Sequence, residues 1–347
     1  MTTAVVDKKI NTSFTELSLS SDDEEVERTS KNIYFDDFDK IDVSTKTFIV
    51  MTNISLNIDN VFNFLPITNY IVVPKRRGRK KKIKPIDPNK DIKNGSIITL
   101  EYLNKIRGVD LKKKKKKNKD KKKRGNYFRN SVTVVMIIDG KRINFKVSRN
   151  GKIQMTGCKF DKHSESCVKW FWHYIKDTKD IYEIVDNKGN DVDSPPKPIE
   201  MKAIFIPAMR NIDFGLNFLV DREKLDEYFN MCTGYHSLLE TSFGYTGVNI
   251  KIPVKKSILD LQLKQLVCID GIWQKISHIP YKEYLTMLPQ KEVTKKINKQ
   301  RYNTFLVFHS GKVIMSGMEA TYMKDVYYEF LDIIRDCYDI IEERLDV

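Results

Sequence analysis

Residues 149–157, RNGKIQMTG, return as HSGKVIMSG at residues 309–317. Glycine, lysine, methionine and glycine hold the same places in both copies. A β-rich run precedes each copy, at residues 143–147 and 304–308, and an amphipathic helical pattern follows each one. A strand–turn–strand–helix unit that occurs twice indicates an internally duplicated fold.

Both copies are predicted to be hairpins. Asn150–Gly151 and Ser310–Gly311 are turn pairs in which glycine can adopt a positive φ. Side chains on either side alternate with a period of two, as in a sheet with one buried face. Each unit is therefore predicted to be an antiparallel sheet with a long helix on one face, which is an α+β fold.

Composition limits the class of protein. The 347 residues are enough for one or two substantial cores. Five cysteines without a C-x-x-C motif favour a reducing compartment over a disulfide framework. The N-terminus has no apolar segment of signal-peptide length, and no apolar run is long enough to cross a bilayer. We therefore expect an intracellular protein without membrane association.

The net charge of +15 is concentrated in two short runs. Residues 75–84 hold eight basic and no acidic side chains, and residues 112–124 hold eleven basic and one acidic. These runs carry more positive charge than the whole chain, so the folded remainder is expected to be close to neutral. A general affinity for nucleic acid would then come from the runs.

Composition also divides the chain. We predict a disordered acidic tail at 1–40, because its polar, acid-rich sequence cannot bury enough apolar area to fold. The first half spans 41–180, and its basic insertion at 74–125 contains one apolar island at 97–106. The second half spans 181–347, with another insertion at 254–300.

The two copies resemble the repeats of the TATA-box-binding protein (TBP) family. Members carry an apolar-Phe-x-Ser-Gly-Lys stretch ending near Thr-Gly in each half. Here it reads VSRNGKIQMTGCK at 147–159 and VFHSGKVIMSGME at 307–319. The resemblance covers residues 131–174, 210–252 and 304–338. It implies a saddle of two pseudo-symmetric halves of curved antiparallel sheet, with long helices on the convex face.

The resemblance also implies a DNA-binding underside, where two aromatic side chains per half enter base steps of the minor groove. In the second half Phe308 and Tyr245 match these wedge positions. Without the resemblance, both would be interpreted as ordinary hairpin aromatics that cover the core.

The first half departs from this pattern. Ser131 and Ser148 take the two wedge positions, seventeen residues apart. Serine cannot fill an unstacked base step, so this end is not expected to kink DNA. Tyr127 and Phe128 lie just before the strand and are an alternative wedge if the loop is shifted.

Other positions of the DNA surface follow from the same resemblance. Lys251 matches a phosphate-contacting arginine, and its uncharged first-half counterpart is expected to be Ile137. A central asparagine matches Asn211, with a first-half counterpart near Asn53. The remaining predicted contacts are the hydroxyls of Thr156 and Ser316, their neighbours Gln154 and Ile314, and the repeat lysines Lys152 and Lys312.

The first basic run adds a separate candidate. Residues 74–82, PKRRGRKKK, contain Arg-Gly-Arg, the core of an AT-hook, whose arginines enter narrow A·T minor grooves. The proline that usually follows is missing, and a nuclear-localisation signal or a solvated phosphate-binding arm fits equally well. The run at 112–124 is expected to be a flexible, non-specific DNA tether. The basic-arm residues are Lys75, Arg76, Arg77, Arg79, Lys80, Lys81 and Lys82.

Metal binding and catalysis are not expected. The spacing of Cys158, His163, Cys167 and His173 fits no standard zinc motif, and buried core side chains are the favoured interpretation. The sequence shows no nucleophile–His–acid set, phosphate-binding glycine loop or carboxylate cluster. We therefore expect no cofactor and no enzymatic activity.

Together these features predict a TBP-like transcription-initiation factor that binds A·T-rich promoter DNA. The resemblance implies a TFIIB-like factor and RNA polymerase as partners, with a monomer bound to double-stranded DNA. Insertions and a lysine- and asparagine-rich composition favour a divergent member from a large DNA virus or a protist, acting in a nucleus or a cytoplasmic viral factory. Two other classes stay open: a TBP-derived protein-interaction scaffold with degenerate DNA bending, and a basic architectural or DNA-packaging protein.

Overall fold

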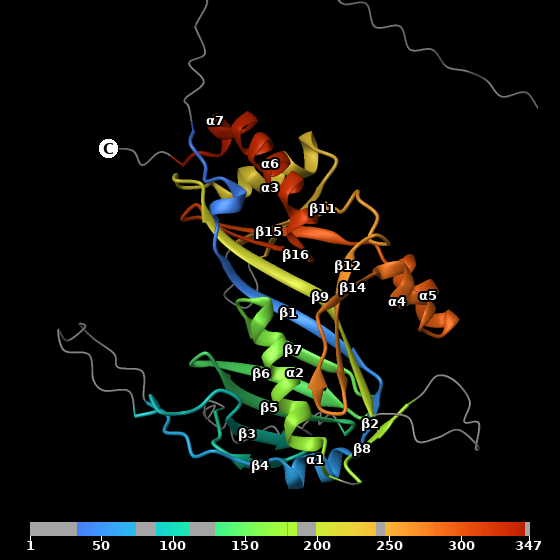
Figure 1. Cartoon of the computed structure of the whole chain (residues 1–347). Coiled ribbons are helices and arrows are strands. Elements are labelled where there is room, and N and C mark those ends of the chain that lie inside the picture. Colours follow the sequence, from blue (N-terminus) through green and yellow to red (C-terminus); the bar gives the residue numbers. More distant parts are fainter. Residues whose placement is uncertain are drawn as a thin grey trace, which may run out of the picture. The chain divides into compact units, whose positions relative to one another are not determined.

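The computed structural model describes residues 33–73, 88–111, 129–178, 180–185, 199–240 and 247–343 (Figure 1). The predicted acidic tail before residue 33, the basic arm, the run at 112–124, Tyr127, Phe128 and Tyr245 lie outside these residues. None of the helices in the described part is long and apolar enough to cross a membrane.

One antiparallel sheet organises the folded part (Figure 1). Its first-half strands are β1 (Val43–Thr52), β3 (Ile97–Tyr102), β4 (Lys105–Gly108), β5 (Ser131–Ile138), β6 (Lys141–Ser148) and β7 (Ile153–Cys158). Its second-half strands are β9 (Glu200–Gly215), β10 (His236–Glu240), β11 (Gly247–Pro253), β15 (Tyr302–Phe308) and β16 (Lys312–Gly317). A separate two-stranded sheet pairs β2 (Ile54–Leu56) with β8 (Tyr182–Ile184).

The strand order shows the duplication. The sequence β1-β7-β6-β5-β3 in the first half repeats as β9-β16-β15-β11-β10 in the second, and β1 pairs with β9 where the halves meet. A helix follows the central strand of each half, and a longer helix ends each half. These helices are α1 (Ile58–Phe64) and α2 (Asp161–Ile175) in the first half, and α3 (Arg222–Cys232) and α6 (Ala320–Asp336) in the second. The predicted α+β fold with two pseudo-symmetric halves and insertions is confirmed.

The strand register shows which residues of the two halves are equivalent. Met155 of β7 pairs with Phe48, and Met315 of β16 pairs with Ile212, so Phe48 and Ile212 are equivalent. Two residues earlier on each strand lie Lys46 and Arg210, which pair directly with each other across β1 and β9. The two halves are therefore related about this pair.

The long helices bury one face of the sheet. In β6 and β15 every second side chain is fully buried, among them Phe145 and Phe305. The Phe145 ring makes an edge contact with Phe171 of α2, with ring centroids 6.3 Å apart, and Phe305 stacks on Phe330 of α6 at 4.1 Å. Burying one such ring stabilises the fold by about 2 kcal/mol. An aromatic pair between the sheet and the long helix therefore occurs in each half, with an edge contact in the first and a stacked contact in the second.

The repeated glycines make the predicted turns. Gly151 has a φ of +69° and Gly311 a φ of +72°. A Cβ atom would lie 2.2 Å from the Ile54 carbonyl oxygen at Gly151, and 2.2 Å from the Phe218 carbonyl oxygen at Gly311. The glycine at the same place in both repeats thus also lets each hairpin approach the chain that leaves the central strand of its own half.

The folded unit begins before residue 41, which corrects the predicted end of the tail. Phe35 and Phe38 are buried, and the Phe38 ring lies 5.5 Å from that of Tyr327 on α6. Phe38–Lys40 form the 3-10 helix η1, whose N-cap Asp37 accepts a hydrogen bond from the Asp39 backbone N–H. The two buried rings, hydrogen bonds from the Tyr327 and Tyr328 hydroxyls and an ion pair with Lys324 hold this acidic segment on α6.

The apolar island at 97–106 is also more than an insertion. It forms β3 and part of β4, and β3 holds the place in the first half that β10 holds in the second. The segment 181–185 contains β8, which pairs with β2, so these residues continue the first half. The sequence prediction assigned β3 to an insertion because highly charged runs flank it, although the duplicated fold requires this strand.

The insertion at 254–300 is folded. It forms β12 (Gln262–Ile269), β13 (Ile272–Trp273), β14 (Ser277–Pro280), α4 (Tyr281–Thr286) and α5 (Gln290–Ile297). β12 pairs with both β14 and the N-terminal part of β9, as Figure 1 shows. The chain ends its described part after α7 (Tyr338–Ile341).

Candidate nucleic-acid interface

The second half presents a patterned face opposite the helices. Phe305, Val307, Val313 and Met315 point into the core and are fully buried. Strand alternation therefore places the intervening side chains of β15 and β16 on the other face. These side chains are Thr304, Leu306 and Phe308 on β15, and Lys312, Ile314 and Ser316 on β16.

Cross-strand pairing arranges this face in rows over four strands. A polar row contains Lys251, Thr304, Ser316 and Asn211. The next row contains Asn249, Leu306, Ile314 and Asp213, with apolar side chains at its centre. The predicted contacts Lys251, Ser316, Asn211 and Ile314 are thus brought together, and Lys312 lies at the start of β16. We call these residues, with Phe308, the second-half face.

The residue opposite Phe308 lies two positions after the predicted wedge residue Tyr245, which is outside the described residues. Gly247, not Tyr245, lies directly opposite Phe308. A Cβ atom at Gly247 would lie 2.8 Å from Leu306 Cδ1, because the Leu306 side chain covers the glycine. Leu306 and Phe308 therefore form the apolar end of the second-half face. Phe308, like Leu306, is only partly buried.

The first half carries a polar strip on the corresponding strands. Gln154 and Thr156 are exposed on β7, and their partners on β6 are Lys146 and Asn144. The Thr156 hydroxyl donates a hydrogen bond to the Asn144 carbonyl oxygen at 3.3 Å. Lys152 lies just before β7 and is half-buried. The predicted surface residues of this half therefore lie together.

The two serines at the predicted first-half wedge positions lie side by side. Ser131 and Ser148 are direct partners at the ends of β5 and β6, and both are half-buried. The equivalent pair in the second half is Gly247 and Phe308. The first half therefore has hydroxyl groups where the second has an aromatic ring.

Two counterpart assignments are corrected by the register. Counting from Ser131 and Gly247, the first-half equivalent of Lys251 is the buried Val135, not Ile137. The equivalent of Asn211 is Thr47 rather than a residue near Asn53. Asn53 instead joins β1 to β9: its amide donates to the Glu200 carbonyl at 2.8 Å and accepts from the Lys202 N–H at 2.8 Å. A two-residue error in aligning the hairpins caused the first misassignment.

Part of the first-half face is covered. Val135 and Ile137 are buried together with Ile98, and Tyr70, Ile92 and Leu111 pack against them. These covering side chains come from the segments that flank the basic runs. The C-terminal part of β5, at Val135 and Ile137, is therefore covered, whereas Ser131 at the start of the strand is not.

The insertion at 254–300 covers a second part, at the centre of the sheet. Tyr281, Tyr284 and Leu285 of α4 form a buried cluster with Ile204 and Ile206 of β9. The side chains of Ile49 and Met51 on β1 pack against this cluster. They face away from Phe48 and Val50, which belong to the core beneath α2. Leu261 with Leu263 and Ile279 with Tyr281 are apolar residues spaced by two, and they are the local sequence signal for this contact.

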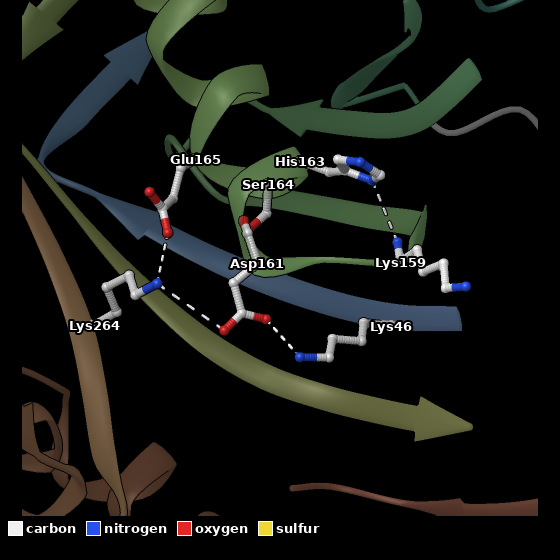
Figure 2. Close-up of polar contacts among 7 residues, drawn as sticks. All are labelled: Lys46, Lys159, Asp161, His163, Ser164, Glu165 and Lys264. Carbon is white, nitrogen blue, oxygen red and sulfur yellow. Dashed lines mark hydrogen bonds and ion pairs between the residues drawn. The ribbon is translucent and has the colours of Figure 1, made fainter. Parts of the chain in front are cut away.

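An ion-pair network holds the insertion against the first half (Figure 2). Asp161, in the first turn of α2, contacts Lys46 of β1 at 2.7 Å and Lys264 of β12 at 4.0 Å. Lys264 also contacts Glu165 at 2.5 Å. A carboxylate at this helix end is favoured by the helix dipole. The network therefore joins a central strand, a core helix and the insertion.

Three of the four candidate zinc ligands, Cys158, His163 and Cys167, are buried core residues as predicted, whereas His173 is exposed. Cys158 and Cys167 are fully buried. Burial raises the pKa of the Cys158 thiol to about 12 and the pKa of Cys167 well above its usual value, which disfavours the thiolate that zinc requires. No group of three or more potential metal ligands occurs among the described residues.

Comparisons with known proteins give viral relatives. The chain is 27% identical over 312 residues to the uncharacterized protein 335L of Invertebrate iridescent virus 6, covering 86% of this chain and 85% of that protein. It is 26% identical over 211 residues to a TATA-box-binding protein-like protein of Acanthamoeba polyphaga mimivirus, covering 50% of this chain and 57% of that protein. The resemblance to viral TBP-like sequences is thereby confirmed.

No family model matches the chain. Among solved structures, Methanococcus jannaschii TBP aligns with a TM-score of 0.41 and 11% identity, covering 85% of this chain and 98% of that one.

Proposed function

We propose that this protein is a TBP-like transcription-initiation factor that binds duplex DNA mainly through its second-half face. One observation carries the proposal: β11, β15, β16 and β9 align a polar row and an apolar row beside the Phe308 ring. Sheet residues that enter a minor groove need this combination of flat apolar contacts and small polar groups.

Each row has a distinct role in the proposed complex. The hydroxyls of Thr304 and Ser316 contact base edges, where the minor groove distinguishes A·T from G·C pairs. Leu306 and Ile314 contact the floor of the groove, and Phe308 enters a base step. Lys251 and Lys312 are exposed and contact phosphates on either side.

The bend is proposed to be one-sided. Ser131 and Ser148 supply no ring, and the neighbouring Val135 and Ile137 are covered by other side chains. The first half then contributes the polar strip around Gln154 and Thr156 without opening a base step.

A bending assay tests the proposal. Fluorescent labels on both ends of an A·T-rich duplex report its end-to-end distance by energy transfer when the full chain binds. We expect Phe308→Ala to remove most of the bend, while Asn144→Ala, on the polar strip, leaves it unchanged. A wild-type complex that leaves the duplex straight would contradict the proposed mechanism.

The resemblance further implies that the bound monomer recruits a TFIIB-like factor and RNA polymerase in a nucleus or a cytoplasmic viral factory. Sedimentation of the protein on one duplex site checks the proposed one-to-one stoichiometry. Recovery of polymerase subunits with the DNA-bound protein, and their absence with the Phe308→Ala variant, checks recruitment.

A protein-interaction scaffold is the second candidate function. It is favoured by the coverage of β5 and of the central strands, which leaves less of the sheet open than a long duplex footprint needs. A scaffold would give neither bending nor A·T preference in the bending assay, but would still recover protein partners in the recovery experiment. Binding that merely follows the lysine runs, with a steep salt dependence and no sequence preference, would instead indicate an architectural protein.

A further inference from the structure

A groove lies between the insertion and the second-half face. It has a volume of about 460 Å³ and is lined on one side by sheet residues, among them Ile49, Ile206, Thr304 and Ser316. The other side consists of the residues at and after the end of α5, from Lys296 to Arg301. The inserted segment therefore creates a site that the duplicated fold does not have by itself.

The groove is strongly basic. Lys251, Lys296, Lys299 and Arg301 line it, and none of its lining residues, all within the described part of the chain, is acidic. Arg301 donates hydrogen bonds to the carbonyls of Lys296 at 3.0 Å and Lys299 at 2.9 Å. The guanidinium thereby fixes the rim by closing the C-terminal end of α5.

The charges at the rim also repel one another. Burial lowers the pKa of Lys296, and the nearby Lys152, Arg301 and Lys299 lower it further, against an opposite effect of Glu292. A concentration of cations with so little compensation is typical of a site that receives an anion.

The floor of the groove is suited to flat apolar groups. Ile49 and Ile206 pair across β1 and β9, and Met318 lies beside them. Tyr302, at the start of β15, lines the groove with 48% of its surface exposed. A basic rim with an apolar floor and an exposed aromatic ring is the combination found in grooves for single-stranded nucleic acid.

We propose that this groove binds a short stretch of single-stranded DNA, with phosphates at Lys296, Lys299 and Arg301 and a base stacked on Tyr302. The volume of the groove favours single-stranded over double-stranded DNA. A volume of this order suits a small ligand or about one to two nucleotides. A duplex is excluded because α4 packs directly on Ile204 and Ile206 at the inner end.

This site goes beyond the proposed duplex-binding function, and Lys296, Lys299 and Tyr302 allow the two to be tested apart. Lys251, Thr304 and Ser316 belong to both surfaces, so the two forms of DNA should compete. None of the three distinguishing residues faces Phe308 across the sheet.

Matched charge variants test the proposal in the full chain. Lys296→Gln/Lys299→Gln removes two charges from the groove. The control, Lys291→Gln/Lys295→Gln, removes two exposed charges from α5 that do not line the groove. The probe is a fluorescent single strand of about ten nucleotides, followed by anisotropy. We expect the groove variant to bind about tenfold more weakly, and its salt slope to fall by about 1.4 for two lost phosphate contacts. The control should retain both values.

Tyr302 provides a second test that is independent of charge. Tyr302→Ala is expected to weaken single-strand binding about tenfold, and Tyr302→Phe, which keeps the ring, to restore it. The side chain is exposed, so neither change is expected to disturb folding, which circular dichroism checks.

Three outcomes would overturn the proposal. Equal losses in the two lysine variants would show that only overall charge matters. Competition by a mononucleotide as strong as that by the strand, per nucleotide, would indicate a small-anion site. An equal loss of bending on the labelled duplex in the groove variant would show that its lysines serve the duplex instead.

Discussion

Phe308 and Gly247 are direct cross-strand neighbours at the end of β15 and β11. The glycine leaves room for Leu306, whose Cδ1 would lie 2.8 Å from a Cβ atom at that position. One ring and one aliphatic side chain therefore share the place where the first half has Ser131 and Ser148. This difference determines which end of the sheet is able to open a base step.

A gain of bending is the first prediction. Ser131→Phe/Ser148→Phe places two rings as direct partners on the face opposite α2. We expect the DNA bend to increase by tens of degrees, about the size of one wedge-induced kink. Energy transfer across the labelled duplex measures it. Asn144→Phe, on the same face but away from the strand end, serves as the control, and an equal increase there would contradict the prediction.

The repeated turn glycines lead to a prediction about stability. At Gly151 or Gly311 an alanine would combine a positive φ with a Cβ atom 2.2 Å from a backbone carbonyl oxygen. We expect either substitution to cost about 3 kcal/mol of unfolding free energy. Urea unfolding measures this loss.

Gly140 supplies the matched control. Its φ is +70°, but no atom lies within 4 Å of a Cβ built there. Gly140→Ala should therefore cost only the conformational strain, about 1 kcal/mol. Equal losses at Gly140 and Gly151 would mean that the close carbonyl contact has no energetic weight.

The contact between Lys264 and Glu165 predicts a pattern of coupling. The Glu165 side chain is only 12% exposed, so Lys264→Met leaves a largely buried carboxylate without its nearest cation. We expect a loss of about 2 kcal/mol, most of which Lys264→Met/Glu165→Leu should recover, since apolar replacements of buried ion pairs are often neutral.

The exposed pair of Lys256 and Asp325 is the comparison for this network. Lys256→Gln is expected to change the unfolding free energy by less than about 0.5 kcal/mol. If the double variant at Lys264 and Glu165 is as unstable as the single one, the ion pair itself, rather than an unpaired carboxylate, is what matters.

His163 predicts a dependence of stability on pH. Burial lowers its pKa, with Lys141 and Lys162 acting in the same direction and Asp139 against them. Nδ1 of the ring accepts a hydrogen bond from the Lys159 N–H at 3.3 Å, which requires an unprotonated nitrogen (Figure 2). The folded state therefore favours neutral histidine.

The direction of the effect follows by linkage. As pH falls below about 6.5, the unfolded chain takes up a proton at His163 before the folded chain does, so stability is lost toward lower pH. His163→Asn keeps an acceptor and removes the titration. Urea midpoints between pH 7.5 and 5 should fall less steeply in this variant, and identical slopes would contradict the assignment.

The sequence predicted the duplicated unit well because its signals are local. The glycines of both turns, the alternation in β6 and β15, and the helical spacing in α2 and α6 all depend on neighbouring residues. The seventeen-residue separation of Ser131 and Ser148 was read from the sequence, and the tight hairpin between β5 and β6 makes the two serines direct partners.

The rest depended on contacts between distant segments. In the second half, an insertion instead of a tight hairpin joins β11 to β15, so no turn fixed the position opposite Phe308. Tyr70 and Leu111 flank basic runs, yet they cover the same strand. The packing of Tyr284 on Ile204 joins residues that no local pattern relates. Each of these contacts changes which part of the sheet is open.

The pairing of β12 with β9 has a consequence for the chain as a whole. β16 accompanies β9 only from Arg210 to Gly215, and β12 accompanies it from Glu200 to Phe205. Without the insertion, that stretch of β9 would have unpaired N–H and C=O groups beside the apolar Ile204. An edge of this kind can pair with another copy of the chain. We therefore expect a chain trimmed to its two repeated parts to self-associate through this edge of β9 rather than to behave as a smaller version of the protein.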